Sequence, residues 1–194
     1  MTESEWEGST DPTPMLDCLG GHASDRKLIL FCLYWCPIYA REWANGDPAY
    51  SAAMQFAEAG DNLTDLRLAW LSEEAEAEGE RSLPERPLSW ARLLTEPTVR
   101  EIFEVPPARQ APSILREIFG NPFRSTAIDH AWLVPAVTSL AQVIYDEWAF
   151  DRMPELAEAL QSVGCQEFSI LDHCRTPARH VRGCWVVDLL LGKK

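Results

Sequence analysis

Apolar residues recur every three or four positions in several stretches of the chain, which is the spacing of one face of an α-helix. The pattern is most regular in the last third, where it predicts one helix from Val137 to Trp148 and a second that Asp151 caps and Gly164 ends. Shorter stretches with the same spacing predict helices at 14–19, 25–38, 48–58, around 66–70, 113–119 and 168–174. Thr13 is the expected cap of the first of these helices, and Ser24 is the expected cap of the second.

The final apolar run, CWVVDLLLG, does not indicate its structure by periodicity alone. A short continuous apolar run is typical of a buried strand. However, Gly192 and the two lysines that follow it are typical of a helix C-terminus, where glycine ends the helix and positive charge complements the dipole. We therefore predict a helix here.

Prolines at 84, 87, 97, 106, 107 and 112 interrupt the middle of the chain and predict short helical turns joined by loops. The fold class expected from these patterns is all-α: a compact multi-helix domain of about seven to nine helices with a proline-rich irregular middle. Three regions follow: an N-terminal helical region at 1–80, a proline-rich connecting region with short helices at 81–133, and a C-terminal helical region at 134–194 that packs with the first into one domain.

Charge and hydropathy narrow the classes of partner. The chain has 194 residues and a net charge of −13, which opposes binding to nucleic acid and to an anionic membrane surface. Its longest apolar run, Leu28–Ala40, has 13 residues and contains a proline, whereas a membrane span needs about 20.

The acidic N-terminus has no export-signal pattern, so we expect a cytoplasmic protein. Trp6, in this polar segment, is the tryptophan expected to contact something outside the chain.

Five stretches carry a resemblance to a known family: TDPTPMLDCL, ASDRKLILF, LREIFGNPF, IYDEWAFDRMPELAEAL and DHCRTPARHVRGCWVVDLLLGK. They resemble a family of paralogous proteins expanded in planctomycete bacteria, which has no established activity. The resemblance implies a complete, soluble, intracellular bacterial domain and assigns no catalytic residue. Members of the family typically have a cysteine- and arginine-rich stretch where this chain reads FCLYWCPIYA, and only Cys36 matches that pattern.

Cysteine and histidine spacing raises the question of a metal site. Two ligands four positions apart on a helix share one face, and both Cys32 with Cys36 and His180 with Cys184 have this spacing. The chain lacks the compact Cys-x2-Cys motif of most structural zinc sites, and unligated cysteines are commonly buried as small apolar residues. The two alternatives are thus buried thiols without a cofactor, which we favour, and a zinc site whose candidate ligands are Cys32, Cys36, Cys165, Cys174, His180 and Cys184.

A cysteine nucleophile is a further alternative, because a nearby imidazole or arginine activates a thiolate. Cys174 lies between His173 and Arg175, and Cys184 lies one helical turn after His180. No protease or transferase signature surrounds either cysteine, and the chain has no Gly-rich phosphate loop, HExxH or GxSxG motif. We therefore assign no catalytic residue.

A local basic cluster precedes the final helix. Arg175, Arg179, His180 and Arg182 could bind an anion or an acidic segment of a partner, helped by a helix N-terminus. The alternative is intramolecular, with the arginines tying the last helix to the rest of the protein. We favour the intramolecular role.

Strong amphipathic helices without catalytic motifs predict a non-enzymatic interaction or regulatory module that binds another protein, and neither nucleic acid nor a membrane. A metal-stabilised helical module is the second hypothesis, and a cysteine-dependent enzyme is the third.

Overall fold

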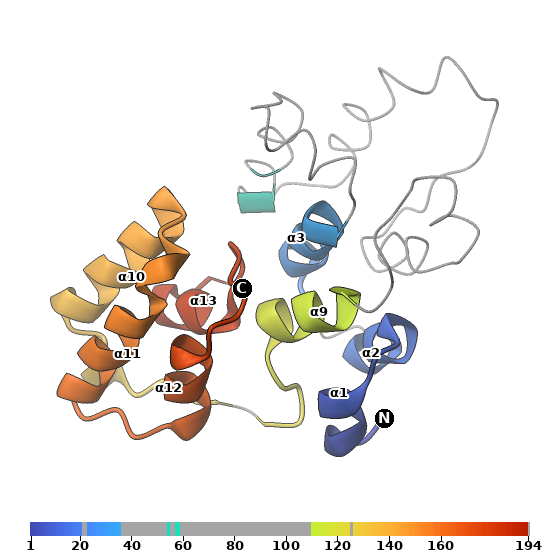
Figure 1. The fold of residues 1–194 in the computed structure, drawn as a ribbon. Coiled ribbons are helices and arrows are strands. Elements are labelled where there is room, and N and C mark those ends of the chain that lie inside the picture. Colours follow the sequence, from blue (N-terminus) through green and yellow to red (C-terminus); the bar gives the residue numbers. More distant parts are fainter. Residues whose placement is uncertain (21–22, 36–53, 55–56, 59–109, 125, 194) are drawn as a thin grey trace, which may run out of the picture. The chain divides into compact units, whose positions relative to one another are not determined.

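A computed structural model describes residues 1–20, 23–35, 54, 57–58, 110–124 and 126–193. This part of the chain contains eight α-helices and two short 3-10 helices, and it contains no strand (Figure 1). The predicted all-α fold class is confirmed. The α-helices are α1 (Glu3–Gly8), α2 (Pro12–Leu19), α3 (Asp25–Trp35), α9 (Ala111–Phe119), α10 (Pro135–Glu147), α11 (Met153–Ser162), α12 (Phe168–Arg175) and α13 (Trp185–Leu191).

The chain forms two compact units, Met1–Arg116 and Glu117–Lys194, and the boundary falls inside α9. The helices expected at 48–58 and around 66–70, and the proline-rich stretch up to residue 109, lie wholly or mostly outside the described residues. None of the helices that the structure describes is long and apolar enough to cross a membrane.

The first unit begins with a helix, α1, that the spacing of apolar residues does not predict. Thr2 and Glu5 form a reciprocal capping box at the start of α1: the Thr2 hydroxyl accepts from the Glu5 N–H at 3.3 Å, and the Glu5 carboxylate accepts from the Thr2 N–H at 2.7 Å. Trp6 is only 1% exposed. The expectation that Trp6 faces outward was therefore wrong, because α1 folds its ring into the core of this unit.

Arg116 holds the end of α1 in place. Its guanidinium donates to the Trp6 carbonyl oxygen at 2.6 and 3.0 Å and to the Ser9 carbonyl oxygen at 2.7 Å. These carbonyls belong to the last turn of α1 and the residues after it, where free acceptors and the helix dipole favour a cation. Arg116 thereby links α9 to α1 within the first unit.

The next two helices start at short polar side chains. Asp11, rather than the predicted Thr13, caps α2, and its carboxylate accepts from the Thr13 N–H at 2.9 Å. The sequence TDPTP offers two cap-plus-proline pairs, and the chain uses the first. Ser24 caps α3 as predicted, since its hydroxyl accepts from the Lys27 N–H at 3.3 Å.

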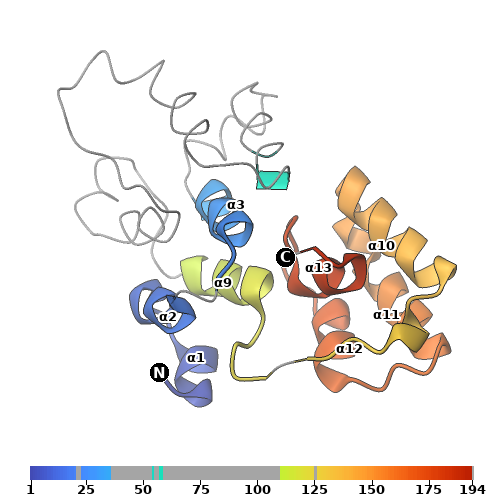
Figure 2. The same ribbon diagram turned by 180° about the vertical axis from the view of Figure 1, so that it is seen from behind.

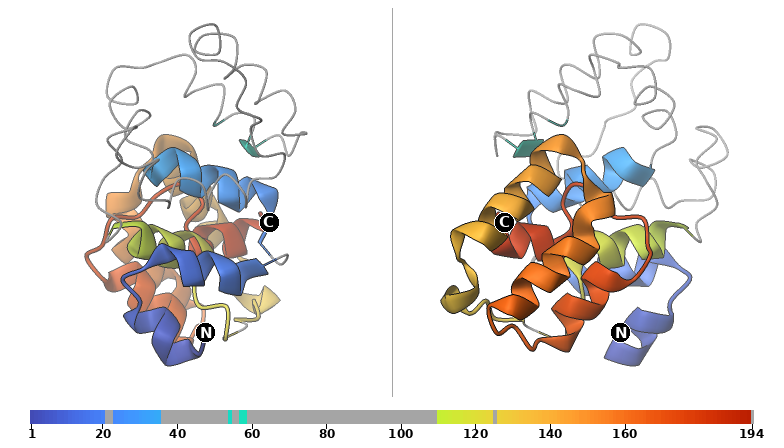
Figure 3. Two further views of the ribbon diagram at one scale, coloured as in Figure 1. Left: turned by 90° about the vertical axis from the view of Figure 1, so that its right-hand side faces the viewer. Right: turned by 60° about the vertical axis from the view of Figure 1, so that its left-hand side comes forward.

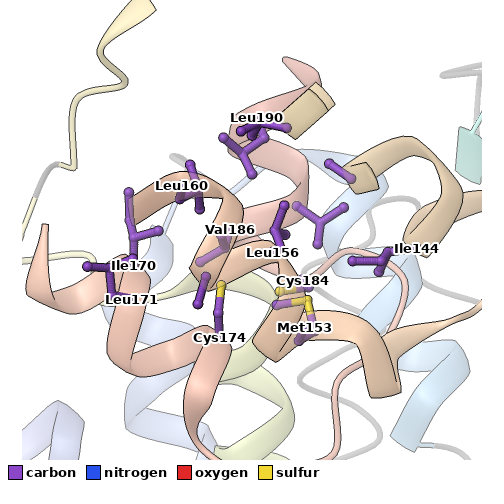
Figure 4. Close-up of a cluster of buried hydrophobic side chains, with 14 of the residues drawn as sticks. Ile144, Met153, Leu156, Leu160, Ile170, Leu171, Cys174, Cys184, Val186 and Leu190 are labelled. Carbon is purple, nitrogen blue, oxygen red and sulfur yellow. The ribbon is translucent and has the colours of Figure 1, made fainter. Parts of the chain in front are cut away.

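In the second unit, α11 packs against both α10 and α12, and α13 packs against α10 and α12 (Figures 1 and 2). Figure 3 shows these four helices, coloured orange to red, from two further directions. Their apolar faces meet in one core, which includes the buried cysteines Cys165, Cys174 and Cys184. Figure 4 draws part of this core and labels Cys174 and Cys184. The predicted apolar stripes of the C-terminal helices are confirmed in the following buried residues: Val137, Ala141, Ile144, Tyr145, Met153, Leu156, Ala157 and Leu160.

The last apolar run is a helix, as predicted. α13 ends at Leu191, and Gly192 follows in the left-handed region at φ +66°. A second predicted cap, Asp151, was also wrong: it lies inside a 3-10 helix, Phe150–Arg152, and α11 begins at Met153. Helix α11 has no side-chain cap but has a proline in its first turn. Proline suits this position because the N–H that it lacks would have had no partner inside the helix.

Candidate metal centre

Four ligand-type side chains of the second unit converge on one point. Glu117 lies in the last turn of α9, His173 lies on α12, His180 lies in the segment between α12 and α13, and Cys184 is the residue that precedes α13. One ligand atom from each lies within 4.8 Å of every other. Glutamate, histidine and cysteine all occur as zinc ligands in proteins.

A turn between α12 and α13 brings the two later residues back to the earlier ones. Helix α12 ends at Arg175, and Thr176 closes it by donating its backbone N–H to the Asp172 carbonyl oxygen at 2.9 Å. A second tight turn follows, in which the Cys184 N–H donates to the Val181 carbonyl oxygen at 2.9 Å and Gly183 has φ +93°. Glycine suits this backbone because a side chain disfavours positive φ.

The distances between the converging atoms are short. His180 Nδ1 lies 3.2 Å from both carboxylate oxygens of Glu117. His173 Nε2 lies 3.4 Å from Glu117 Oε2 and 3.2 Å from the Sγ atom of Cys184. The backbone N–H of Val181 donates to Glu117 Oε1 at 3.3 Å, which fixes the carboxylate from a further side.

The cluster is buried. The side chains of Glu117 and His180 are 6% and 5% exposed, that of His173 is 18% exposed, and Cys184 is fully enclosed. Burial lowers the pKa of His173, which favours the neutral imidazole that a metal requires. Burial, and then the negative charge of Glu117, raises the pKa of the Cys184 thiol well above its usual range.

These properties argue against the third hypothesis, a cysteine nucleophile. A nucleophilic cysteine must reach the thiolate form and must be accessible to a substrate. Cys184 has His173 beside it, but it is enclosed and its thiol resists ionisation. Cys174 is also buried, and desolvation raises its pKa to about 12. Neither cysteine has the environment of an activated thiol.

The structure brings together two of the six ligands that the sequence suggested, His180 and Cys184. Cys165 and Cys174 lie buried in the core of the same unit, outside the cluster. Cys32 lies on α3 in the other unit, and Cys36 lies outside the described residues. The remaining two members of the cluster, Glu117 and His173, were not in the predicted ligand set.

The residues of the expected anion-binding cluster mostly face partners within the protein. Arg182 donates to the Tyr145 carbonyl oxygen at 3.0 and 3.3 Å and lies over the rings of Tyr145 and Trp148, 4.7 and 4.6 Å from the ring centroids. Arg175 donates to the Gln161 side chain at 2.6 Å, and Arg179 is exposed. His180 faces Glu117. The choice between an anion-binding role and an intramolecular role for this cluster stays a prediction.

The fold and the cluster together define the chain as an all-α protein with a buried glutamate, histidine and cysteine site in its C-terminal unit. Comparison of the chain with protein-family models, curated proteins and solved structures found no match. The resemblance to the planctomycete family therefore stays a prediction.

Proposed function

We propose that this protein is a non-catalytic helical module whose C-terminal unit is stabilised by a structural transition-metal ion, with zinc the best-suited metal. The observation that carries the proposal is the convergence of Glu117, His173, His180 and Cys184 on one buried point. Of the functions weighed from the sequence, the metal-stabilised module is the one that this geometry supports best.

The spacing of the ligand atoms supports a tetrahedral ion. Zinc binds nitrogen at about 2.0 Å and sulfur at about 2.3 Å, so neighbouring ligand atoms around it lie about 3.3 to 3.6 Å apart. The separations between His180 and Glu117, His173 and Glu117, and His173 and Cys184 are 3.2, 3.4 and 3.2 Å. The four ligand atoms lie within 4.8 Å of one another, so the wider pairs would have to close by up to about 1 Å to reach this spacing.

Charge supports a divalent ion as well. A bound Zn²⁺ with one carboxylate, one thiolate and two neutral imidazoles has no net charge, which suits a site with almost no access to water. The mixture of nitrogen, sulfur and oxygen ligands favours zinc over the hard ions Mg²⁺ and Ca²⁺, which prefer oxygen. Four protein ligands leave no position for a substrate, so the role is structural.

Such an ion would stabilise the unit by joining distant parts of the sequence. Glu117 and His180 are 63 positions apart, and the ion would connect the end of α9 to α12 and to the start of α13. Because the ligands converge only in the folded state, the free energy of metal binding adds to the free energy of unfolding. That the module binds another protein stays a prediction from the sequence.

Cobalt substitution tests this proposal. The full chain is stripped of metal with a chelator and titrated with Co²⁺, which gives visible absorption bands in a tetrahedral site and a near-ultraviolet charge-transfer band with a thiolate ligand. We expect both signals to saturate at about one Co²⁺ per chain, as a single four-ligand site requires.

Two cysteine variants make the test specific. Cys184→Ala should lose the charge-transfer band and most of the affinity, because a ligand is removed. Cys174→Ala is the matched control: it removes a buried thiol of the same core that lies outside the cluster, and it should keep both signals. Absence of tetrahedral absorption in the wild-type protein, or equal loss in both variants while each stays helical by circular dichroism, would reject the metal site.

A further inference from the structure

The second ring nitrogen of His173 has an unusual partner for a metal-binding histidine. The indole N–H of Trp185 donates to His173 Nδ1 at 3.2 Å. An indole nitrogen can only donate, so Nδ1 must present its lone pair to it. A neutral imidazole carries one hydrogen, and that hydrogen is therefore on Nε2, the nitrogen that faces Cys184 and Glu117.

This arrangement satisfies the cluster without metal. The Nε2 hydrogen points at two acceptors, Cys184 Sγ at 3.2 Å and Glu117 Oε2 at 3.4 Å. A metal ion would need the Nε2 lone pair in place of that hydrogen. The imidazole would remain neutral, and its hydrogen would have to be on Nδ1, where it would meet the indole N–H of Trp185, donor against donor. Metal-binding histidines ordinarily have an acceptor at this position.

We infer that Trp185 opposes metal loading by holding His173 in the tautomer whose hydrogen occupies the metal position. The inference rests on the proposed function and adds a regulatory element to the same site. Metal and the hydrogen bond between Trp185 and His173 exclude each other, so loading breaks that bond and displaces the indole from Nδ1.

The position of Trp185 couples this displacement to the backbone. Trp185 is the first residue of α13 and directly follows the ligand Cys184. Its ring lies against Gly120, so closely that a Cβ atom there would be 3.1 Å from Trp185 Cγ. Trp185 is partly exposed, so its side chain can move toward solvent when the hydrogen bond to His173 breaks. The metal-free and metal-bound states are therefore expected to differ at the start of α13.

Removal of the indole N–H tests the inference. Trp185→Phe keeps an aromatic ring and deletes the donor. We expect the variant to bind zinc about two- to tenfold more tightly than the wild-type protein, which corresponds to the loss of one competing hydrogen bond. Zinc affinity of the full chain is measured by competition with a chelating dye. Trp132→Phe, at a buried tryptophan of the same core, controls for loss of packing and should leave zinc affinity unchanged.

A second readout needs no metal. Nitrogen-15 spectra of the imidazoles in the metal-free wild-type chain should show the His173 hydrogen on Nε2. A hydrogen on Nδ1 would overturn the inference and leave the metal site standing, as would unchanged or weaker zinc binding by Trp185→Phe. No zinc binding by the wild-type chain would instead overturn the proposed function, and this inference with it.

Discussion

At the residue scale, three cysteines of the C-terminal unit illustrate how burial controls chemistry. Cys165, Cys174 and Cys184 each lie in the apolar core, and desolvation is the first cause of a raised pKa at all three. A thiolate in that environment loses the solvation that water would give it. Only a metal ion at the cluster would compensate this cost, and it would do so for Cys184 alone.

Alkylation of the native protein should therefore separate the cysteines. With its pKa at about 12, Cys174 is a thiolate in only about one molecule in ten thousand at pH 8, and it is also inaccessible. In the presence of a chelator, iodoacetamide should modify partly exposed Cys18 on α2 at least about a hundredfold faster than Cys174, because thiolate content and access both control the rate. Mass spectrometry of peptides gives the rates. Comparable modification of Cys174 in the folded chain would contradict the burial described above.

At the element scale, sequence patterns predicted the middles of helices better than their ends. The three- and four-residue spacing of apolar positions located α10 and α11 because each helix buries one face in the same core. Helix α13 was predicted instead from Gly192 and the lysines that follow it. The ends depend on single polar side chains that compete locally, so Asp11 replaced Thr13 as the cap of α2. Helix α1 is too short for a periodicity argument, although its capping signal, Thr2 with Glu5 three residues later, was present in the sequence.

Two glycines at helix ends form a matched pair in which the effect of an alanine substitution on the free energy of unfolding can be compared. Gly120 follows α9 at φ +67° and Gly192 follows α13 at φ +66°, so alanine would meet the same backbone strain at both. A Cβ atom at Gly192 would have nothing within 4 Å, whereas at Gly120 it would press on the Trp185 ring.

Gly192→Ala should lower the free energy of unfolding by about 1 kcal/mol, the cost of a left-handed alanine, and Gly120→Ala should lower it further. Urea unfolding followed by circular dichroism measures both variants under one condition. Equal costs would show that the contact between Gly120 and Trp185 contributes nothing.

At the scale of the whole molecule, the site was predicted only in part because half of it depends on tertiary structure. His180 and Cys184 have a spacing that the sequence makes visible. Glu117 is 63 positions from His180, and no local pattern indicates that the carboxylate of an amphipathic helix will be buried beside it. His173 was visible as a neighbour of Cys174, but its partner in the structure is Cys184, eleven positions later. Convergence of this kind follows from the tertiary structure of the second unit and not from spacing along the chain.

Elemental analysis of the purified, untagged protein tests the central claim most directly. The chain is prepared without chelators, incubated with zinc, and freed of unbound metal by gel filtration. A buried site with four protein ligands predicts about one zinc ion per chain, retained through the column. Zinc at the level of the buffer blank would contradict the claim, and it would identify Glu117, His173, His180 and Cys184 as a hydrogen-bonded cluster that holds the C-terminal unit together without metal.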